Sequence, residues 1–281
     1  MAIPRTLMAH NRFERPENKK PKRVVFLSVE GNVTEPDYFR YVKEYQKQLG
    51  IKAVVDIRVL QRAGTDSAIL DVLNLLENYI EIRNDASFDT KIKELEIKNY
   101  DSEFITRYIE DKDSIPLKEQ HKFEAILWKE QLDLEYLCFL NKYHGENDIF
   151  GVVVDRDEQS HTEDQFETLF CRCDEKRYKC FLTNPRFEFW LLLHVSDVKK
   201  EYAADELEKM LDGKNKSVDA HLHDKTGMGK KKTIQRKVFE QHFLHNIDTA
   251  IQRASGFCTS RNDLLTQLGT NLGELFALLR E

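Results

Sequence analysis

The stretch RVVFLSVEG, from Arg23 to Gly31, indicates the fold class of this chain. Its first part is almost entirely apolar and rich in β-branched side chains, which is typical of a strand buried on both faces. The strand ends at Glu30. The next segment, PDYFRYVKEYQKQLG, begins with Pro36, which suits the first turn of a helix, and ends with Gly50, which suits its end. Thr34 would cap this helix. The stretch therefore predicts a strand that leads directly into a helix.

The same alternation continues along the chain. A second strand is expected at residues 52–60, followed by a helix that Asp66 or Ser67 would cap. Further strands are expected at residues 149–154 and 177–184, with a helix at residues 162–176 between them and Thr162 as its cap. A short, largely buried helix would follow from Pro185. Alternating strands and helices predict an α/β fold, a parallel sheet with right-handed crossovers and flanking helices.

Three regions follow from this pattern. Residues 1–22 are basic and polar and are expected to form a flexible arm. Residues 23–195 would form the α/β core, with a helical insertion at about 84–147 that has no strand signal. Residues 196–281 would be a helical extension without strands, ending in an amphipathic helix from Asp263 to Leu279. The apolar faces of the insertion and of this last helix would pack internally, against a partner protein, or in a homo-oligomer.

Composition narrows the class of protein. Hydrophobic residues make up 41% and charged residues 33% of the 281 residues, as in ordinary globular proteins. No apolar run approaches the roughly 18 residues that cross a bilayer, and the start lacks the apolar segment of a secretory signal. The five cysteines are scattered and form no pair of CxxC motifs, which argues against a zinc ribbon. We therefore expect a cytoplasmic protein that does not associate with membranes.

The formal net charge of −6 argues against binding over a long stretch of duplex DNA. Two basic clusters, at residues 19–23 and 225–237, could still contact a compact nucleic acid.

Acidic residues directly follow two of the predicted strands. Glu30 ends the first strand, while Asp155 and Asp157 end the strand at residues 149–154. Ligands of parallel sheets bind at the carboxyl ends of the strands, so these acids are expected near one another. Grouped carboxylates repel unless a cation lies among them, and Mg²⁺ prefers such oxygen ligands. Each acid taken singly would be an ordinary loop residue; together they favour a metal site.

Two segments resemble other known motifs but do not match them at the positions that matter. A phosphatase of the haloacid-dehalogenase type needs Thr or Val where Gln159 stands, and its motif normally follows the first strand. The segment TGMGKKKT resembles a phosphate-binding loop, but Lys231 stands where Ser or Thr should be, and no strand precedes it.

Three segments in this order, VEGNVTEPDYF (29–39), VVVDRDE (152–158) and TNPRFEFWLLLH (183–194), resemble the RloB-like proteins, which are encoded near phage-defence genes. That family is considered a branch of the Toprim fold. The resemblance implies a Toprim-like core, in which Glu30 is the general acid or base with partial metal contact. It further implies that Asp155 and Asp157 bind Mg²⁺, for which Mn²⁺ would substitute. Gln159 stands where some Toprim enzymes have a third acid, which weakens a two-metal interpretation.

The third segment of the resemblance also carries candidate residues. Glu188 is an acid within an apolar helix, so it should have a partner, either in a structural ion pair or at the site, where it would be catalytic. His194 is more simply a core histidine with satisfied hydrogen bonds. Outside the resemblance, the strongest candidates for phosphate contact are Lys230, Lys231, Lys232 and Arg236, although such runs usually form a solvated face.

These residues predict a Mg²⁺-dependent nuclease that hydrolyses phosphodiester bonds, with RNA favoured over DNA and tRNA as one candidate. The resemblance to the RloB-like proteins further implies a role in phage defence by abortive infection. The alternative is a Toprim-like binding or regulatory module without chemistry, for which the insertion would be the partner surface. A topoisomerase would need a further domain, and a primase would need a zinc module.

Overall fold

The computed structural model describes residues 23–52, 55–60, 69–84, 100–129, 134, 147–157, 161–212, 217–229 and 232–281. The described chain forms two compact units. One holds the described residues of 23–60, 69–76 and 147–281, and the other holds those of 77–134. The predicted arm at residues 1–22 and the caps Asp66 and Ser67 lie outside the described residues.

The larger unit contains a sheet of five strands in the order β2-β1-β3-β4-β5. These are β1 (Arg23–Val29), β2 (Val55–Leu60), β3 (Ile149–Asp155), β4 (Lys179–Asn184) and β5 (Gly269–Thr270). The first four run parallel, and the two-residue β5 pairs antiparallel with β4. The predicted α/β fold with a parallel sheet flanked by helices is confirmed.

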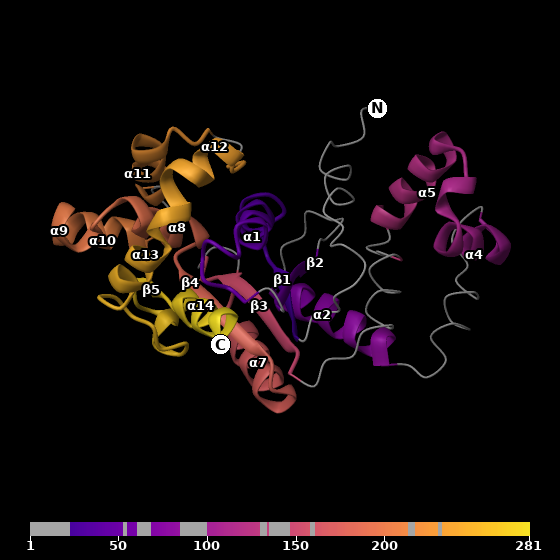
Figure 1. Cartoon of the computed structure of the whole chain (residues 1–281). Coiled ribbons are helices and arrows are strands. Elements are labelled where there is room, and N and C mark those ends of the chain that lie inside the picture. The colour runs from indigo at the N-terminus through magenta and orange to yellow at the C-terminus, as the bar shows by residue number, and fades with distance from the viewer. Residues whose placement is uncertain are drawn as a thin grey trace. The chain divides into compact units, whose positions relative to one another are not determined.

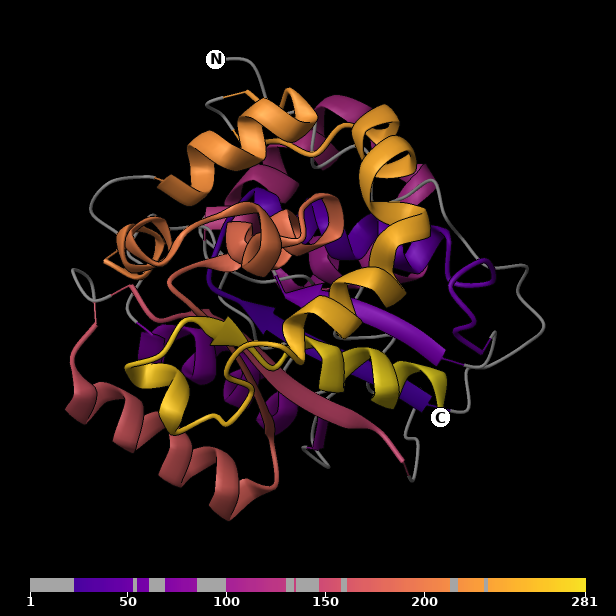
Figure 2. The same ribbon diagram turned by 90° about the vertical axis from the view of Figure 1, so that its left-hand side faces the viewer.

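Helices cover both faces of the sheet. Figure 2 shows α7 (Glu163–Lys176) on one side of the sheet and α8 (Phe187–Val195) on the other. Val25, Leu27 and Val29 of β1 belong to the main core cluster, which also contains side chains of α1 (Thr34–Glu44), α13 (Ile247–Ala254) and α14 (Leu272–Arg280). The alternating residues of β1 are also buried, because a strand with helices on both sides has no solvent face.

Helix α8 is apolar apart from Glu188 and His194, and every residue from Phe187 to His194 is buried. Its main partners are α13 and α11 (Ser217–Thr226), so the region after residue 195 packs into the same unit as the sheet. The remaining short elements of this region are α9 (Val198–Glu201), α10 (Ala204–Leu211), α12 (Arg236–Val238), the π-helix η3 (Phe239–Phe243) and the 3₁₀ turn η4 (Leu244–Asn246).

The second unit is helical where it is described. It contains the end of α2 (Ile69–Asn84), then α4 (Ser102–Glu110), the 3₁₀ turn η2 (Lys112–Ser114) and α5 (Leu117–Lys129). The side chains of Tyr100, Phe104 and Tyr108 pack around Phe123, with ring centroids 4.7–5.1 Å from it. Both units appear in Figure 1.

The prediction for the last helix was wrong. Residues 263–265 form the 3₁₀ turn η5, residues 269–270 form β5, and α14 begins only at Leu272. The side chain of Asn271 binds the edge of β4: it accepts from the Leu182 amide (2.7 Å) and donates to the Cys180 carbonyl (3.1 Å). A Cβ at Gly269 would lie 2.0 Å from the Cys258 carbonyl oxygen, so only glycine permits this approach. The sheet edge therefore overrides the helical periodicity.

Two capping predictions had different outcomes. Thr162 caps α7 through a capping box with Gln165, as predicted. Thr34 does not cap α1; it is the first residue of that helix, and its hydroxyl donates to the carbonyl of Lys232 (3.2 Å).

Candidate functional site

The carboxyl ends of β1 and β3 lie side by side and bring two of the predicted acids into contact. Val29 pairs with Val153, and the Glu30 amide donates to the Val153 carbonyl at 3.0 Å. Oε2 of Glu30 accepts from the amide of Asp155, also at 3.0 Å. Residues that are far apart in the chain therefore meet because their strands are neighbours in a parallel sheet.

Glu35, an acid in the first turn of α1, belongs to the same cluster. Its side chain folds back so that Oε1 accepts from the Gly31 amide at 3.1 Å. A Cβ at Gly31 would lie 2.0 Å from the Glu35 carboxylate, so the glycine leaves the space that this carboxylate occupies. Its position five residues after Glu30, across one tight turn, is the signal that could have identified it.

The acids influence one another strongly. Burial, then the nearby Glu188 and Glu30, raise the pKa of Glu35 to about 7. Burial also raises the pKa of Asp155 well above its usual range, and Glu30, Glu35 and Glu188 raise it further. The four carboxylates of Glu30, Glu35, Asp155 and Glu188 thus form one cluster, called the acidic cluster below.

The chemistry of the acidic cluster fits a hard divalent cation. Mutual repulsion of buried carboxylates is what such a cation would relieve, and carboxylate oxygens are its preferred ligands. In the described ranges, however, no three His, Cys, Asp or Glu side chains are already arranged around a common metal position. The donors suit Mg²⁺, but their present arrangement is not that of a finished coordination shell.

Asp157 lies two residues beyond the end of β3 and is half-buried. Its carbonyl accepts from the His161 amide at 3.1 Å. Arg156, between the two aspartates, points its donors elsewhere: it is 5% exposed and donates to the carbonyls of Leu265 (2.9 Å) and His161 (3.3 Å). Arg156 therefore anchors the backbone of this loop.

A histidine that sequence reasoning missed also contacts the cluster. Nε2 of His161 lies 2.9 Å from Oε1 of Glu30, and the ring is buried. No sequence motif identifies His161; only its place in the loop between Asp157 and the cap of α7 provides a hint.

Two cations border the acidic cluster. Nζ of Lys232 lies 2.9 Å from Oε1 of Glu188 and 3.3 Å from Oδ1 of Asp219. The other Asp219 oxygen lies 3.6 Å from Arg186, at the N-cap of α8. Burial opposes the charge of Lys232, but Glu188 and Asp219 outweigh it and raise the pKa of Lys232. Glu188 therefore has the partner that its burial requires, and that partner is a predicted phosphate-contact residue.

The other predicted phosphate contacts are not brought to the cluster in the part of the chain that the structure describes. Arg236 forms a two-pronged ion pair with Glu44, at the end of α1, and donates to the hydroxyl of Tyr45 at 2.9 Å. Lys230 and Lys231 lie outside the described residues.

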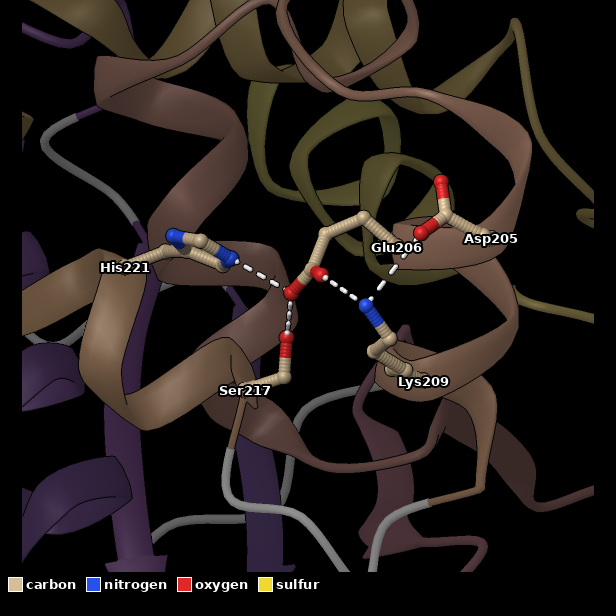
Figure 3. Close-up of polar contacts among 5 residues, drawn as sticks. All are labelled: Asp205, Glu206, Lys209, Ser217 and His221. Atoms are coloured by element: carbon tan, nitrogen blue, oxygen red, sulfur yellow. Dashed lines mark hydrogen bonds and ion pairs between the residues drawn. The ribbon is translucent and has the colours of Figure 1, made fainter.

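A polar network supports the helix that carries Asp219. Figure 3 shows Glu206 of α10 reaching across to α11. Its Oε1 accepts from the Ser217 hydroxyl (2.5 Å) and lies 2.9 Å from Nε2 of His221, while Lys209 binds Oε2 at 3.1 Å. These contacts, with Ser217 contributing most, lower the pKa of Glu206 to about 2. The network ties α11 to α10 and so fixes the helix from which Asp219 contacts Lys232.

His194 lies in the core, as expected. Its ring contacts the Tyr38 hydroxyl (3.1 Å) and the Trp190 carbonyl (2.9 Å). Burial lowers the pKa of His194 to about 3, so the ring is neutral at physiological pH.

Comparison with known proteins gives one match. The family described as RloB-like protein matches residues 25–279 of the chain. Searches of curated proteins and of solved structures gave no match. Among the described residues, no helix is long and apolar enough to span a bilayer.

Proposed function

The chain belongs to the RloB-like protein family, and on that premise we propose that it is a metal-dependent nuclease that hydrolyses phosphodiester bonds. The observation that carries the proposal is the contact between Glu30 and Asp155 at neighbouring strand ends, within a cluster of four carboxylates. A group of buried and half-buried acids, of which Glu35 and Asp155 have raised pKa values, is typical of sites that hold a cation or move protons. Ordinary loop acids would not be gathered in this way.

In the proposed reaction, the oxygen of a water molecule forms a bond to phosphorus, and the bond from phosphorus to the leaving oxygen breaks. One proton passes from the water to the leaving oxygen. Glu30 is the proposed carrier of this proton, because a carboxylate beside the reacting atoms can accept it and return it. Mg²⁺, held by Asp155, Glu30 and Asp157, would polarise a non-bridging oxygen and offset the charge that develops on the phosphate.

Glu35 and Glu188 have different roles in this proposal. Glu35 is buried beside Glu30, and a pKa of about 7 lets it share or store a proton near neutral pH. Glu188 is paired with Lys232 and so holds the ammonium charge of that lysine next to the cluster. That charge would attract a substrate phosphate, as a lysine does at other phosphate sites.

RNA is the proposed substrate class, with a compact RNA such as tRNA favoured over duplex DNA, and phage defence is the proposed role. The formal net charge of −6 supports this choice, because long duplex DNA normally requires an extended basic surface. In the described residues, the cations beside the cluster are confined to a small region around Lys232 and Arg186.

The test is direct. Purified protein is incubated with Mg²⁺ or Mn²⁺ and offered tRNA, single-stranded RNA and plasmid DNA. Cleavage of RNA should be lost in Glu30→Gln and in Asp155→Asn and retained in Asp164→Asn, an exposed acid in the first turn of α7. Activity on every substrate that survives both cluster variants would refute the assignment.

A non-catalytic binding or regulatory module is the second candidate. It is favoured by the absence, in the described part of the chain, of three metal-ligating side chains arranged around one position. Binding of Mn²⁺ without turnover on any of the three nucleic acids would support this module over the nuclease.

A further inference from the structure

The side chain of Glu30 is held at both of its oxygens. Oε2 accepts from the Asp155 amide at 3.0 Å, and Oε1 lies 2.9 Å from Nε2 of His161. The His161 side chain is 1% exposed and that of Glu30 is 10% exposed. One partner is the last residue of β3 and the other, His161, follows that strand by six residues, so the end of β3 and the chain just after it determine the orientation of the carboxylate.

The chemistry of the contact assigns the hydrogen. A carboxylate can only accept, so Nε2 of His161 carries the hydrogen and donates it to Oε1. Nδ1 is buried and has no hydrogen-bond partner among the described residues. A ring that is buried for packing alone would ordinarily satisfy both nitrogens, as His194 does. The hydrogen bond to Glu30 is thus the single polar contact described for this ring.

The position of His161 does not depend on Glu30. Its amide donates to the Asp157 carbonyl, and its carbonyl accepts from the buried Arg156. Its ring meets Phe166 edge-on, with centroids 6.0 Å apart, and the next residue, Thr162, caps α7. His161 is therefore held by Asp157, Arg156 and Phe166 and can support a neighbouring side chain.

We propose that His161 is a positioning residue that fixes the orientation of the Glu30 carboxylate for the reaction. A carboxylate has about four lone-pair sites, and the two contacts above leave two available to a proton or a cation. Fixing two sites also fixes the direction of the other two. The inference rests on the function proposed above, because the orientation of Glu30 matters to turnover only if Glu30 takes part in the reaction.

The kinetic test compares two substitutions. His161→Gln keeps an N–H donor near the place of Nε2, whereas His161→Leu replaces the ring with an apolar side chain. At saturating Mn²⁺, the leucine variant should lower kcat for RNA cleavage by about 10- to 100-fold with KM nearly unchanged, the usual loss when a supporting hydrogen bond to a site residue is removed. The glutamine variant should recover most of that loss. His242→Leu, on η3 and half-buried, is the matched control and should retain wild-type kcat.

A second measurement does not depend on activity. In protein labelled with ¹⁵N-histidine, the His161 ring should show the hydrogen on Nε2, and this preference should weaken in Glu30→Ala. A tautomer that is unchanged in Glu30→Ala would overturn the inference.

Each kinetic outcome has one meaning. Suppose that the wild-type protein cleaves RNA. Full kcat in His161→Leu would then overturn the role of His161, and so would equal losses of kcat in the leucine and glutamine variants. Either result leaves the nuclease assignment intact. A wild-type protein that cleaves no nucleic acid overturns the proposed function and, with it, this role. If thermal unfolding shows that the leucine variant does not fold, His161→Asn takes its place, since it moves the donor away from Glu30 and should lose the same kcat.

Discussion

Replacing Glu35 with glutamine should stabilise the metal-free protein at alkaline pH. The pKa of Glu35 rises from 4.5 for a free glutamate to about 7, first because of burial and then because of the neighbouring acids. The folded state therefore holds this proton more tightly than the unfolded state. The resulting contribution to stability is fully present below pH 4.5 and is lost as the pH rises through about 7.

The magnitude follows from the same values. Each pKa unit corresponds to 1.36 kcal/mol, so the loss amounts to about 3 kcal/mol above pH 7. Glutamine cannot ionise, and its Oε1 can still accept from the Gly31 amide, as the carboxylate does. The variant should thus keep the contact and avoid the loss.

Urea unfolding of metal-free protein at pH 5 and pH 8, followed by a probe in the sheet-bearing unit, measures this effect. The free energy of unfolding of the wild type should fall relative to Glu35→Gln by about 2–3 kcal/mol between the two pH values, slightly less than the full loss because a free glutamate is already mostly ionised at pH 5. Glu167→Gln, an exposed acid on α7, is the control and should follow the wild type. Equal pH dependence in the wild type and Glu35→Gln would refute the argument that Glu35 is buried among like charges.

Three further outcomes are expected. Asp155→Asn should abolish RNA cleavage yet raise the Tm of the metal-free protein at pH 8, because it removes a carboxylate whose pKa is raised by burial and three neighbouring acids; a lowered Tm in a thermal scan would contradict this. Lys232→Gln should lower the free energy of unfolding by about 1–3 kcal/mol, because it leaves Glu188 buried without its cation. The same variant should raise KM for RNA. An unchanged urea midpoint would contradict the effect on stability. Gly31→Ala should force the Glu35 carboxylate out of its place, since the added Cβ would lie 2.0 Å from it, and should therefore reduce the pH dependence of unfolding much as Glu35→Gln does; a wild-type pH profile would show that the turn relaxes instead.

The elements of the sheet-bearing unit were largely predictable because their signals are local. The apolar run of β1, the run of β3 that stops at Asp155, and the Thr162 capping box each lie within a few neighbouring residues. The reliance on local signals also explains why the predicted helix at residues 263–279 was wrong. Residues 263–279 carry a helical periodicity, but Asn271 and Gly269 contact β4 and Cys258, and no local pattern records such contacts.

The residues of the candidate site were likewise predictable from the sequence only in part. The sequence by itself determined that Glu30 and Asp155 each stand at the end of a buried strand, because side-chain type and periodicity are properties of the chain. Only the tertiary structure decided that β1 and β3 are neighbours, and hence that these acids touch. It also decided which charges surround them: His161 beside Glu30, Glu35 folded back over Gly31, and Lys232 against Glu188. Electrostatic interaction depends on distance in space and not on separation along the sequence. Strand order and the packing of helices around the sheet set these distances, so the charges around the acids follow from the tertiary structure.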